Sequence, residues 1–315
     1  MTFPKLTYIF IIIFIQIFML ISVFAGEEPT DICSTYHYDK LYYDKDSSGS
    51  IPYGTGLLWK IRNKNGYISH IFGTIHSQDR MVTQIPPFVR LALVKSDRLV
   101  MEIVPDNESN RVFSEAIFFA DDNNLEELVE DVIYSRIQNK ITYYGIDESD
   151  TRRLKPWAVF TLLGRPRPVN APTLEMVLMQ IAIDTNQEIV GLQTINELLM
   201  NLDDIDMSDQ IEILNDTVCN QDEIIRDTKK LVELYFERDL AGIMAFNDQP
   251  HHDEAVYKRF MQKMLIDRNL EIITKIEQHI NSSHAFIAIG ALHLPGESGL
   301  LSLLEKKGYE ISVVY

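Results

Sequence analysis

The order of apolar and polar positions along the chain predicts an α/β fold. Short apolar runs, which are typical of strands, occupy residues 57–61, 67–72, 98–104, 188–192, 285–289 and 309–314. Longer stretches that repeat apolar residues every three or four positions predict helices at about 87–95, 109–120, 131–144, 152–163, 173–186, 207–245, 253–281 and 299–307. Strands that alternate with helices indicate an α/β layer fold, which we expect as one central mixed sheet flanked by helices.

The first 25 residues have the pattern of an export signal. Lys5 is the only charged residue before an apolar stretch from Tyr8 to Phe24, and Val23 and Ala25 are the small residues that a signal peptidase requires. An uncleaved membrane anchor is the alternative, because the apolar stretch approaches the ~20 residues that span a bilayer. Both interpretations place the rest of the chain in an exported compartment, periplasmic or secreted. The anchor would add membrane association through residues 1–25.

The rest of the chain divides into an irregular extension and one domain. Residues 26–53 are rich in Ser, Asp and Tyr and show no periodic pattern, whereas ordered patterning begins at Gly54. No linker rich in Gly, Pro or Ser interrupts residues 54–315, so we expect a single α/β domain. The long helical stretch 205–282 is expected as a helical insertion or cap on that domain.

Composition limits the partners of the chain. Asp and Glu number 46 against 29 Lys and Arg, which gives a formal charge of −17. An acidic chain repels phosphate backbones, so nucleic acid is not an expected partner. Two cysteines are too few for a disulfide scaffold or a four-thiolate zinc site. In an oxidising compartment Cys33 and Cys219 either pair with each other or remain as two thiols.

Two predicted strands end in the same short motif. One leads into Gly73-Thr74-Ile75-His76, and the other leads into Gly290-Ala291-Leu292-His293. Each glycine permits a tight exit from the strand, and the histidine follows just beyond the edge of the sheet. Open α/β sheets bind ligands at the carboxyl ends of their strands, so we expect His76 and His293 to converge there. A single Gly-x-x-His is a common pattern, and only the pair at matching strand ends supports this prediction.

Glu102 adds a carboxylate to the same set. It lies in the apolar run 98–104, which we expect to be covered on both faces of the sheet. A buried carboxylate requires a cation, a hydrogen-bond network or a proton, and a structural salt bridge would satisfy this as well as a metal ion. Two His and one Glu suffice for a divalent metal with open positions for water and substrate. The His-Glu-x-x-His helix of common zinc peptidases, a nucleophile-elbow Ser and a P-loop are absent from the sequence.

A second histidine cluster has a simpler interpretation. His251, His252 and Asp253 follow Pro250 and indicate the start of a helix. Adjacent histidine side chains point apart, which disfavours a shared metal ion.

Several motifs together resemble the TraB/GumN (PrgY/TIKI-like) family over about residues 54–315. The opening matches are Gly56-Leu-Leu-Trp59, Ile71-Phe-Gly-Thr-Ile-His76 and Leu99-Val-Met-Glu102. The closing matches are Asp267-Arg268-Asn269, Ala288-Ile-Gly290-Ala-Leu-His293-Leu-Pro-Gly296 and Gly299-Leu-Leu-Ser-Leu-Leu-Glu-Lys-Lys-Gly308-Tyr309. Weaker matches in the middle are Lys155-Pro-Trp157, Pro172-Thr-Leu174 and Val190-Gly-Leu-Gln-Thr194.

The resemblance implies an α/β fold with one active centre. The positions of this sequence that match the functional residues of the family are Gly73, His76, Glu102, Arg268, Gly290 and His293. Members of the TIKI branch are divalent-metal-dependent peptidases, while others block pheromone signalling or have no assigned reaction. One departure is Gln193, where the family usually has Glu. Gln keeps the shape of that side chain and loses its charge, so metal affinity or a general base would be weakened if the family's Glu takes part.

The hypothesis from sequence is therefore an exported metal-dependent hydrolase of peptide or amide bonds. His76, His293 and Glu102 would hold a divalent ion (Mn, Co or Zn) and its water. Arg268 either stabilises the developing oxyanion or forms a helix-packing ion pair. A metal-free version, with a His as general base oriented by Glu102, stays open. The alternative function is a non-catalytic module of the same fold that binds a peptide or regulates signalling. The expected partner is a peptide or small-molecule substrate.

Overall fold

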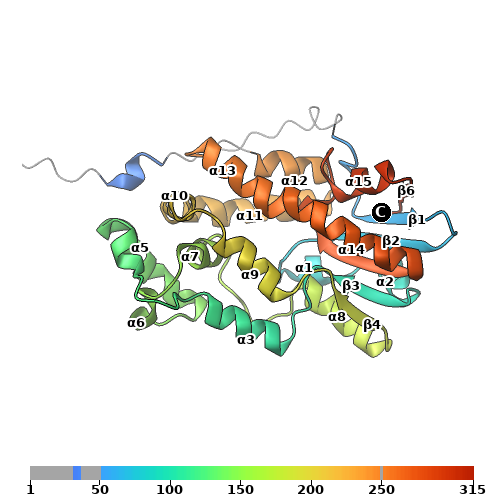
Figure 1. Cartoon of the computed structure of the whole chain (residues 1–315), viewed down its shortest axis with the longest axis horizontal. Coiled ribbons are helices and arrows are strands. Elements are labelled where there is room, and N and C mark those ends of the chain that lie inside the picture. Colours follow the sequence, from blue (N-terminus) through green and yellow to red (C-terminus); the bar gives the residue numbers. More distant parts are fainter. Residues whose placement is uncertain (1–30, 37–50, 249–250) are drawn as a thin grey trace, which may run out of the picture.

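The computed structural model describes residues 31–36, 51–248 and 251–315, and these contain one mixed sheet (Figure 1). The strands are β1 (Leu58–Arg62), β2 (Ile68–Thr74), β3 (Arg98–Met101), β4 (Glu188–Gly191), β5 (Ala285–Gly290) and β6 (Glu310–Val313). Their order across the sheet is β4-β3-β5-β2-β1-β6. Strands β4, β3, β5 and β2 run parallel, whereas β1 is antiparallel to both of its neighbours. The predicted α/β fold with a central mixed sheet is confirmed.

Strand β5 is at the centre of this sheet because its sequence is apolar on both faces. Ala285, Phe286, Ile287, Ala288 and Ile289 are all buried. A parallel strand covered on both sides reads as a continuous apolar run rather than an alternating one. The neighbouring strand β3 ends earlier than predicted, since its pairing with β4 and β5 stops at Met101. Glu102 is therefore the first residue after the strand and not a residue within it.

The helices lie on both sides of the sheet and extend beyond it. The α-helices are α1 (Arg80–Thr83), α2 (Pro87–Val94), α3 (Asn107–Ala116), α4 (Leu125–Leu128), α5 (Asp131–Ile141), α6 (Glu148–Thr151), α7 (Pro156–Leu163), α8 (Leu174–Asp184), α9 (Ile195–Asp203), α10 (Met207–Cys219), α11 (Gln221–Phe236), α12 (Leu240–Asn247), α13 (Glu254–Met261), α14 (Arg268–Ser282) and α15 (Leu300–Lys306). Short 3-10 turns are η1 (Ile32–Ser34), η3 (Thr142–Tyr144) and η5 (Ala291–His293), and η4 (Gln262–Asp267) is a π-helical segment.

The long predicted helix 207–245 is three helices in the structure. Helix α10 ends at Cys219, and α11 begins at Gln221. A second break follows α11, where Arg238 takes a left-handed backbone conformation with φ of 59°. Asp239 then caps α12 by accepting a hydrogen bond from the Gly242 amide at 2.8 Å. The apolar spacing continues across both breaks, so only the backbone geometry marks them.

The molecule has two hydrophobic cores, which lie at opposite ends of its long axis (Figure 1). The first surrounds the sheet and includes residues of α8, α11, α12, α14 and α15. The second contains no residue of the sheet and is built mainly from helical residues between Ile117 and Val218, including Trp157 of α7 and Leu214 of α10. We call this second core and its helices the helical lobe. The helices of the predicted insertion, 205–282, are divided between the two cores.

The N-terminal extension is attached to the helical lobe. Cys33 of η1 forms a disulfide with Cys219 at the end of α10, with a Cα–Cα distance of 5.1 Å. Next to it, the hydroxyl of Tyr36 donates to Glu212 at 2.9 Å. The predicted export signal, residues 1–25, and most of the predicted extension lie outside the described residues. Within the described ranges, no helix has the length and apolar character needed to cross a bilayer.

We predict that the disulfide contributes substantially to stability, because it joins positions 186 residues apart. The double variant Cys33→Ser/Cys219→Ser should lose about 2–4 kcal/mol of unfolding free energy, mainly because its unfolded chain is less constrained. Urea titration of both proteins measures this difference. A reducing agent should bring the wild type to the stability of the variant and leave the variant unchanged. Equal stability of the variant and of the wild type with its disulfide intact would contradict the prediction.

Candidate active site

Three neighbouring strands bring polar side chains to one edge of the sheet. Glu102 follows β3, Gln193 follows β4 and His293 ends the 3-10 turn that follows β5. The backbone keeps them in register, since the Glu102 amide donates to the Ala288 carbonyl at 3.2 Å and the Gln193 amide donates to the Glu102 carbonyl at 2.9 Å. This is the carboxyl edge of the parallel strands, where α/β proteins bind ligands.

An ion pair between Glu102 and Arg268 is central to the site. Nη2 of Arg268 donates to Oε1 of Glu102 at 2.5 Å. Gln193 accepts from Nε and Nη2 of the same guanidinium at 3.0 and 2.6 Å, and the Met264 carbonyl accepts from Nη1 at 3.3 Å. The arginine side chain is 6% exposed, whereas that of Glu102 is 29% exposed. Because Arg268 is committed to protein acceptors, this arrangement favours the ion-pair role over the predicted oxyanion role.

These contacts keep Glu102 ionised. Burial by itself would raise the pKa of Glu102, but the positive charge that His293 acquires in acid and the permanent charge of Arg268 lower it. Hydrogen bonds from Arg268 and the Gly290 amide act in the same direction. The net result is a pKa for Glu102 below its ordinary value. For His293 burial is dominant and lowers the pKa, so its ring is neutral at neutral pH.

His293 is held by an asparagine that the sequence analysis did not select as a site residue. Its Nδ1 lies 2.6 Å from Oδ1 of Asn269, and its Nε2 lies 4.0 Å from Oε1 of Glu102. Both His293 and Asn269 are buried. The one signal in the sequence was the position of Asn269 directly after Arg268, within the segment Asp267-Arg268-Asn269 that resembles the family.

The two motif glycines have different roles. A Cβ on Gly290 would lie 3.4 Å from the His293 ring and 3.6 Å from a Glu102 oxygen, which are ordinary contact distances, so space alone does not require a glycine there. The Gly290 amide also points to Oε2 of Glu102 at 3.4 Å. At Gly73 a Cβ would lie 3.2 Å from the backbone of Ala291. Gly73 thus allows the turn after β5 to pack closely on β2.

His76 does not join the other predicted ligands in this structure. The pairing of Thr74 with Gly290 places both Gly-x-x-His segments at the same edge of the sheet. The His76 side chain, however, is 67% exposed, and its Nδ1 lies 3.4 Å from Glu175 of α8. The physical reason is that His293 lies in a turn packed against β2 and α14, whereas the segment after β2 opens to solvent and offers His76 an acidic partner.

The predicted three-donor metal set is therefore not assembled. Across residues 31–36, 51–248 and 251–315, no group of three or more His, Cys, Asp and Glu side chains is arranged to hold a metal ion. His293 and Glu102 supply two donors that face each other, but Oε1 of Glu102 is already bonded to Arg268. Three ligands around one ion, the minimum for a catalytic zinc site, do not fit this arrangement.

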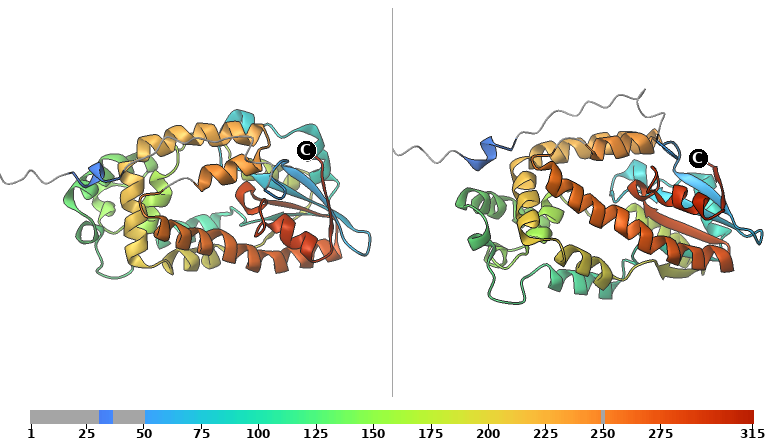
Figure 2. Two further views of the ribbon diagram at one scale, coloured as in Figure 1. Left: turned by 90° about the horizontal axis from the view of Figure 1, so that it is seen from above. Right: turned by 45° about the horizontal axis from the view of Figure 1, so that its top comes forward.

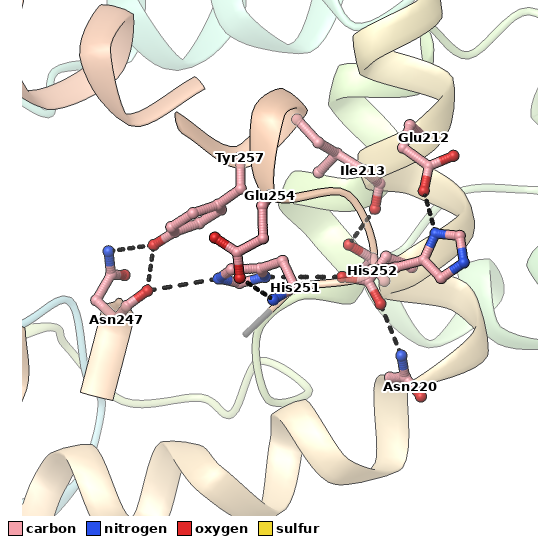
Figure 3. A network of polar contacts seen from close by, with 10 residues as sticks. Glu212, Ile213, Asn220, Asn247, His251, His252, Glu254 and Tyr257 are labelled. Atoms are coloured by element: carbon pink, nitrogen blue, oxygen red, sulfur yellow. Dashed lines mark hydrogen bonds and ion pairs between the residues drawn. The ribbon is translucent and has the colours of Figure 1, made fainter. Parts of the chain in front are cut away.

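The second histidine cluster is separate from this site, and its two histidine side chains contact different partners instead of pointing to one common position (Figure 3). His251 stacks on Tyr257 with ring centres 3.5 Å apart, while His252 bonds to Glu212 at 2.8 Å. Asp253 caps α13 by accepting from the amides of Ala255 and Val256. The two histidines point in different directions, and a helix begins after them as predicted.

Comparison with known proteins identifies the family. The sequence profile of the TraB/PrgY/gumN family matches residues 57–313. The chain belongs to this family. It is also similar to a curated protein named Metalloprotease TIKI1 from Danio rerio, with 21% identity over 309 residues. That match covers 81% of the chain but only 62% of the longer relative. No solved structure matches the chain significantly.

We predict that Glu102 makes stability depend on pH. Its folded-state pKa is lowered, so it stabilises the native state above the ordinary pKa of a glutamate, and this contribution is lost as pH falls through the lowered value. At pH 7 the variant Glu102→Gln should lose about 3 kcal/mol of unfolding free energy, because Arg268 stays buried without its countercharge. Urea titrations from pH 7 down to pH 3 should show the gap between wild type and variant closing.

The matched control is Glu115→Gln, which removes one of the two acidic partners of Arg111 from an exposed charge cluster on α3 and leaves Glu108 in place. That change should cost less than about 1 kcal/mol. A gap for Glu102→Gln that stays constant from pH 7 to pH 3 would contradict the assignment of Glu102 as an ionised, charge-paired group.

Proposed function

We propose that this protein is an exported hydrolase of peptide or amide bonds whose centre is formed by Glu102 and His293. The observation that supports this most directly is an ionised carboxylate facing a neutral imidazole across 4.0 Å at the carboxyl edge of the sheet. A carboxylate and a neutral His are both groups that can act in general base catalysis on a water molecule. The TraB/PrgY/gumN family and the name of the Danio rerio relative support the same reaction class.

Within this proposal each residue has a separate task. Glu102 is the member of the charged group that solvent reaches, since its side chain is 29% exposed while Arg268 is 6% exposed. It orients water and stabilises positive charge that develops on His293. Arg268 does not contact substrate in this scheme. It holds Glu102 in its ionised form and in a fixed orientation, with Gln193 as a second acceptor.

A metal-dependent form of the reaction is the alternative that the name of the Danio rerio relative suggests, although the donors are not assembled for it among the described residues. When bound, a divalent ion would polarise the substrate carbonyl and acidify water. His76, His293 and Glu102 are the residues from which its ligands would come. Because His76 is paired with Glu175 in this structure, we assign no step of the reaction to the metal.

Export is supported by two features. Residues 1–25 have the pattern of a cleavable signal or an anchor, and the disulfide between Cys33 and Cys219 is typical of an oxidising compartment. Both features support a periplasmic or secreted location. The anchor alternative would attach the protein to the membrane through residues 1–25.

The second candidate function is a peptide-binding or signalling-regulatory module without turnover. Gln193 favours it, because the neutral amide replaces a carboxylate that is usual in the family. Its Nε2 is buried without a hydrogen-bond partner among the residues described. One acidic group is thereby removed from the centre, and Arg268 is balanced by Glu102 alone.

The hydrolase proposal predicts cleavage that depends on Glu102 and His293. Folded Glu102→Gln and His293→Ala variants should cleave a peptide library about 10²–10⁴-fold more slowly than the wild type, since His293→Ala loses the general base and Glu102→Gln loses the charge that supports it. The wild-type rate should fall as pH drops through the lowered pKa of His293, because the protonated ring accepts no further proton. The control is His252→Ala, in the separate cluster, which should retain the wild-type rate. Binding of peptides without cleavage by any of these proteins would support the regulatory module instead.

The metal proposal predicts a bound divalent ion that depends on His76. Elemental analysis of the purified protein should find Mn, Co or Zn, and a chelator should abolish cleavage until the ion is restored. His76→Ala should lose the ion, whereas His252→Ala should retain it. Cleavage that persists unchanged in the chelator would instead establish the metal-free reaction with His293 as general base.

A further inference from the structure

The amide of Asn269 has only one orientation that satisfies its neighbours. Its Nδ2 lies 3.0 Å from the Ser298 carbonyl and 3.4 Å from the His293 carbonyl, both of which only accept hydrogen bonds. Reversal of the amide would place Oδ1 against two carbonyl oxygens in a buried site. The nitrogen therefore faces the carbonyls, and Oδ1 is left facing Nδ1 of His293 at 2.6 Å. Amide orientations are assigned from such partners.

An oxygen acceptor at 2.6 Å from Nδ1 determines where the imidazole proton lies. Oδ1 has no hydrogen to donate, so Nδ1 must donate. A neutral imidazole carries one ring proton, and in the neutral ring of His293 this is the proton that Nδ1 donates to Asn269. Its second nitrogen, Nε2, therefore has a free lone pair. Without Asn269 the carboxylate of Glu102, 4.0 Å from Nε2, would favour the opposite tautomer, with the proton on Nε2.

The free lone pair faces the carboxylate of Glu102. Nε2 and Oε1 are 4.0 Å apart, which is longer than a hydrogen bond, and both atoms are acceptors in this tautomer. A group that lies between them has to be a donor. One water molecule, with two O–H groups and hydrogen bonds of about 2.8 Å, spans this separation. The opposite tautomer would place an N–H on the same side and remove the acceptor.

We propose that Asn269 is a positioning residue that holds the His293 proton on Nδ1, so that Nε2 is an acceptor poised beside Glu102 for the O–H of a nucleophile. This inference rests on the proposed hydrolase function for its catalytic consequence, but the tautomer itself does not depend on turnover. Asn269 touches neither substrate nor the reacting atoms. It acts through the orientation and proton of His293, and a residue with this task typically changes activity by about 10–100-fold.

The direct test is the nitrogen spectrum of His293. Protein labelled with ¹⁵N at its histidines is examined at neutral pH by two-bond proton–nitrogen correlation, and the His293 signals are assigned as those missing from a His293→Gln sample. We expect a protonated Nδ1 and a non-protonated Nε2 in the wild type. In Asn269→Ala the proton should redistribute towards Nε2, and the cleavage rate should fall about 10–100-fold.

Asn281→Ala is the matched control, because Asn281 is on the same helix and also hydrogen-bonds through its side-chain amide, to Tyr309. It should keep the wild-type tautomer and rate. A protonated Nε2 in the wild type, or an unchanged tautomer in folded Asn269→Ala, would overturn the proposal. If Asn269→Ala does not fold, the wild-type spectrum still decides between the tautomers. The expected tautomer together with no cleavage by the wild type would refute the hydrolase function and leave the tautomer assignment standing.

Discussion

The buried ion pair between Arg268 and Glu102 is the interaction on which the rest of the site depends. Removing two charges from water costs several kcal/mol for each ion, and this is offset only when their remaining hydrogen-bonding groups are also satisfied. Here the partners come from separate parts of the chain: Gln193 after β4, the Met264 carbonyl from η4 and the Gly290 amide at the end of β5. The pair is stable only when the whole carboxyl edge of the sheet is in place.

Gln193 changes the electrostatics of this centre relative to the family pattern. With glutamine at that position, one guanidinium is balanced by one carboxylate, and His293 is neutral. A glutamate there would give the group an excess negative charge, which attracts a cation. The site keeps a shape into which a guanidinium fits, and it gives up part of the field that would draw in a metal ion.

The sequence predicted the backbone of the site better than its side chains. The apolar runs that became β2, β3 and β5 are local patterns, and their order places Glu102 and His293 at one edge. The direction of His76 was not predictable, because it depends on Glu175, which is distant in the sequence. Asn269 was missed for the same reason, since its partner His293 lies 24 residues further along the chain. Which side chains meet depends on the tertiary structure, and the local pattern of apolar and polar residues does not determine it.

Helices α13 and α14 form one rod with the π-helical segment η4 between them, and Figure 2 shows this rod crossing from the helical lobe to the sheet. At one end Arg259 binds Asp209 of α10 through two hydrogen bonds of 2.7 Å. At the other end Arg268 and Asn269 are consecutive, so the charge beside Glu102 and the acceptor beside His293 cannot move independently. Because one helix carries both residues, a shift of α14 relative to the sheet would change the Arg268–Glu102 and Asn269–His293 contacts together.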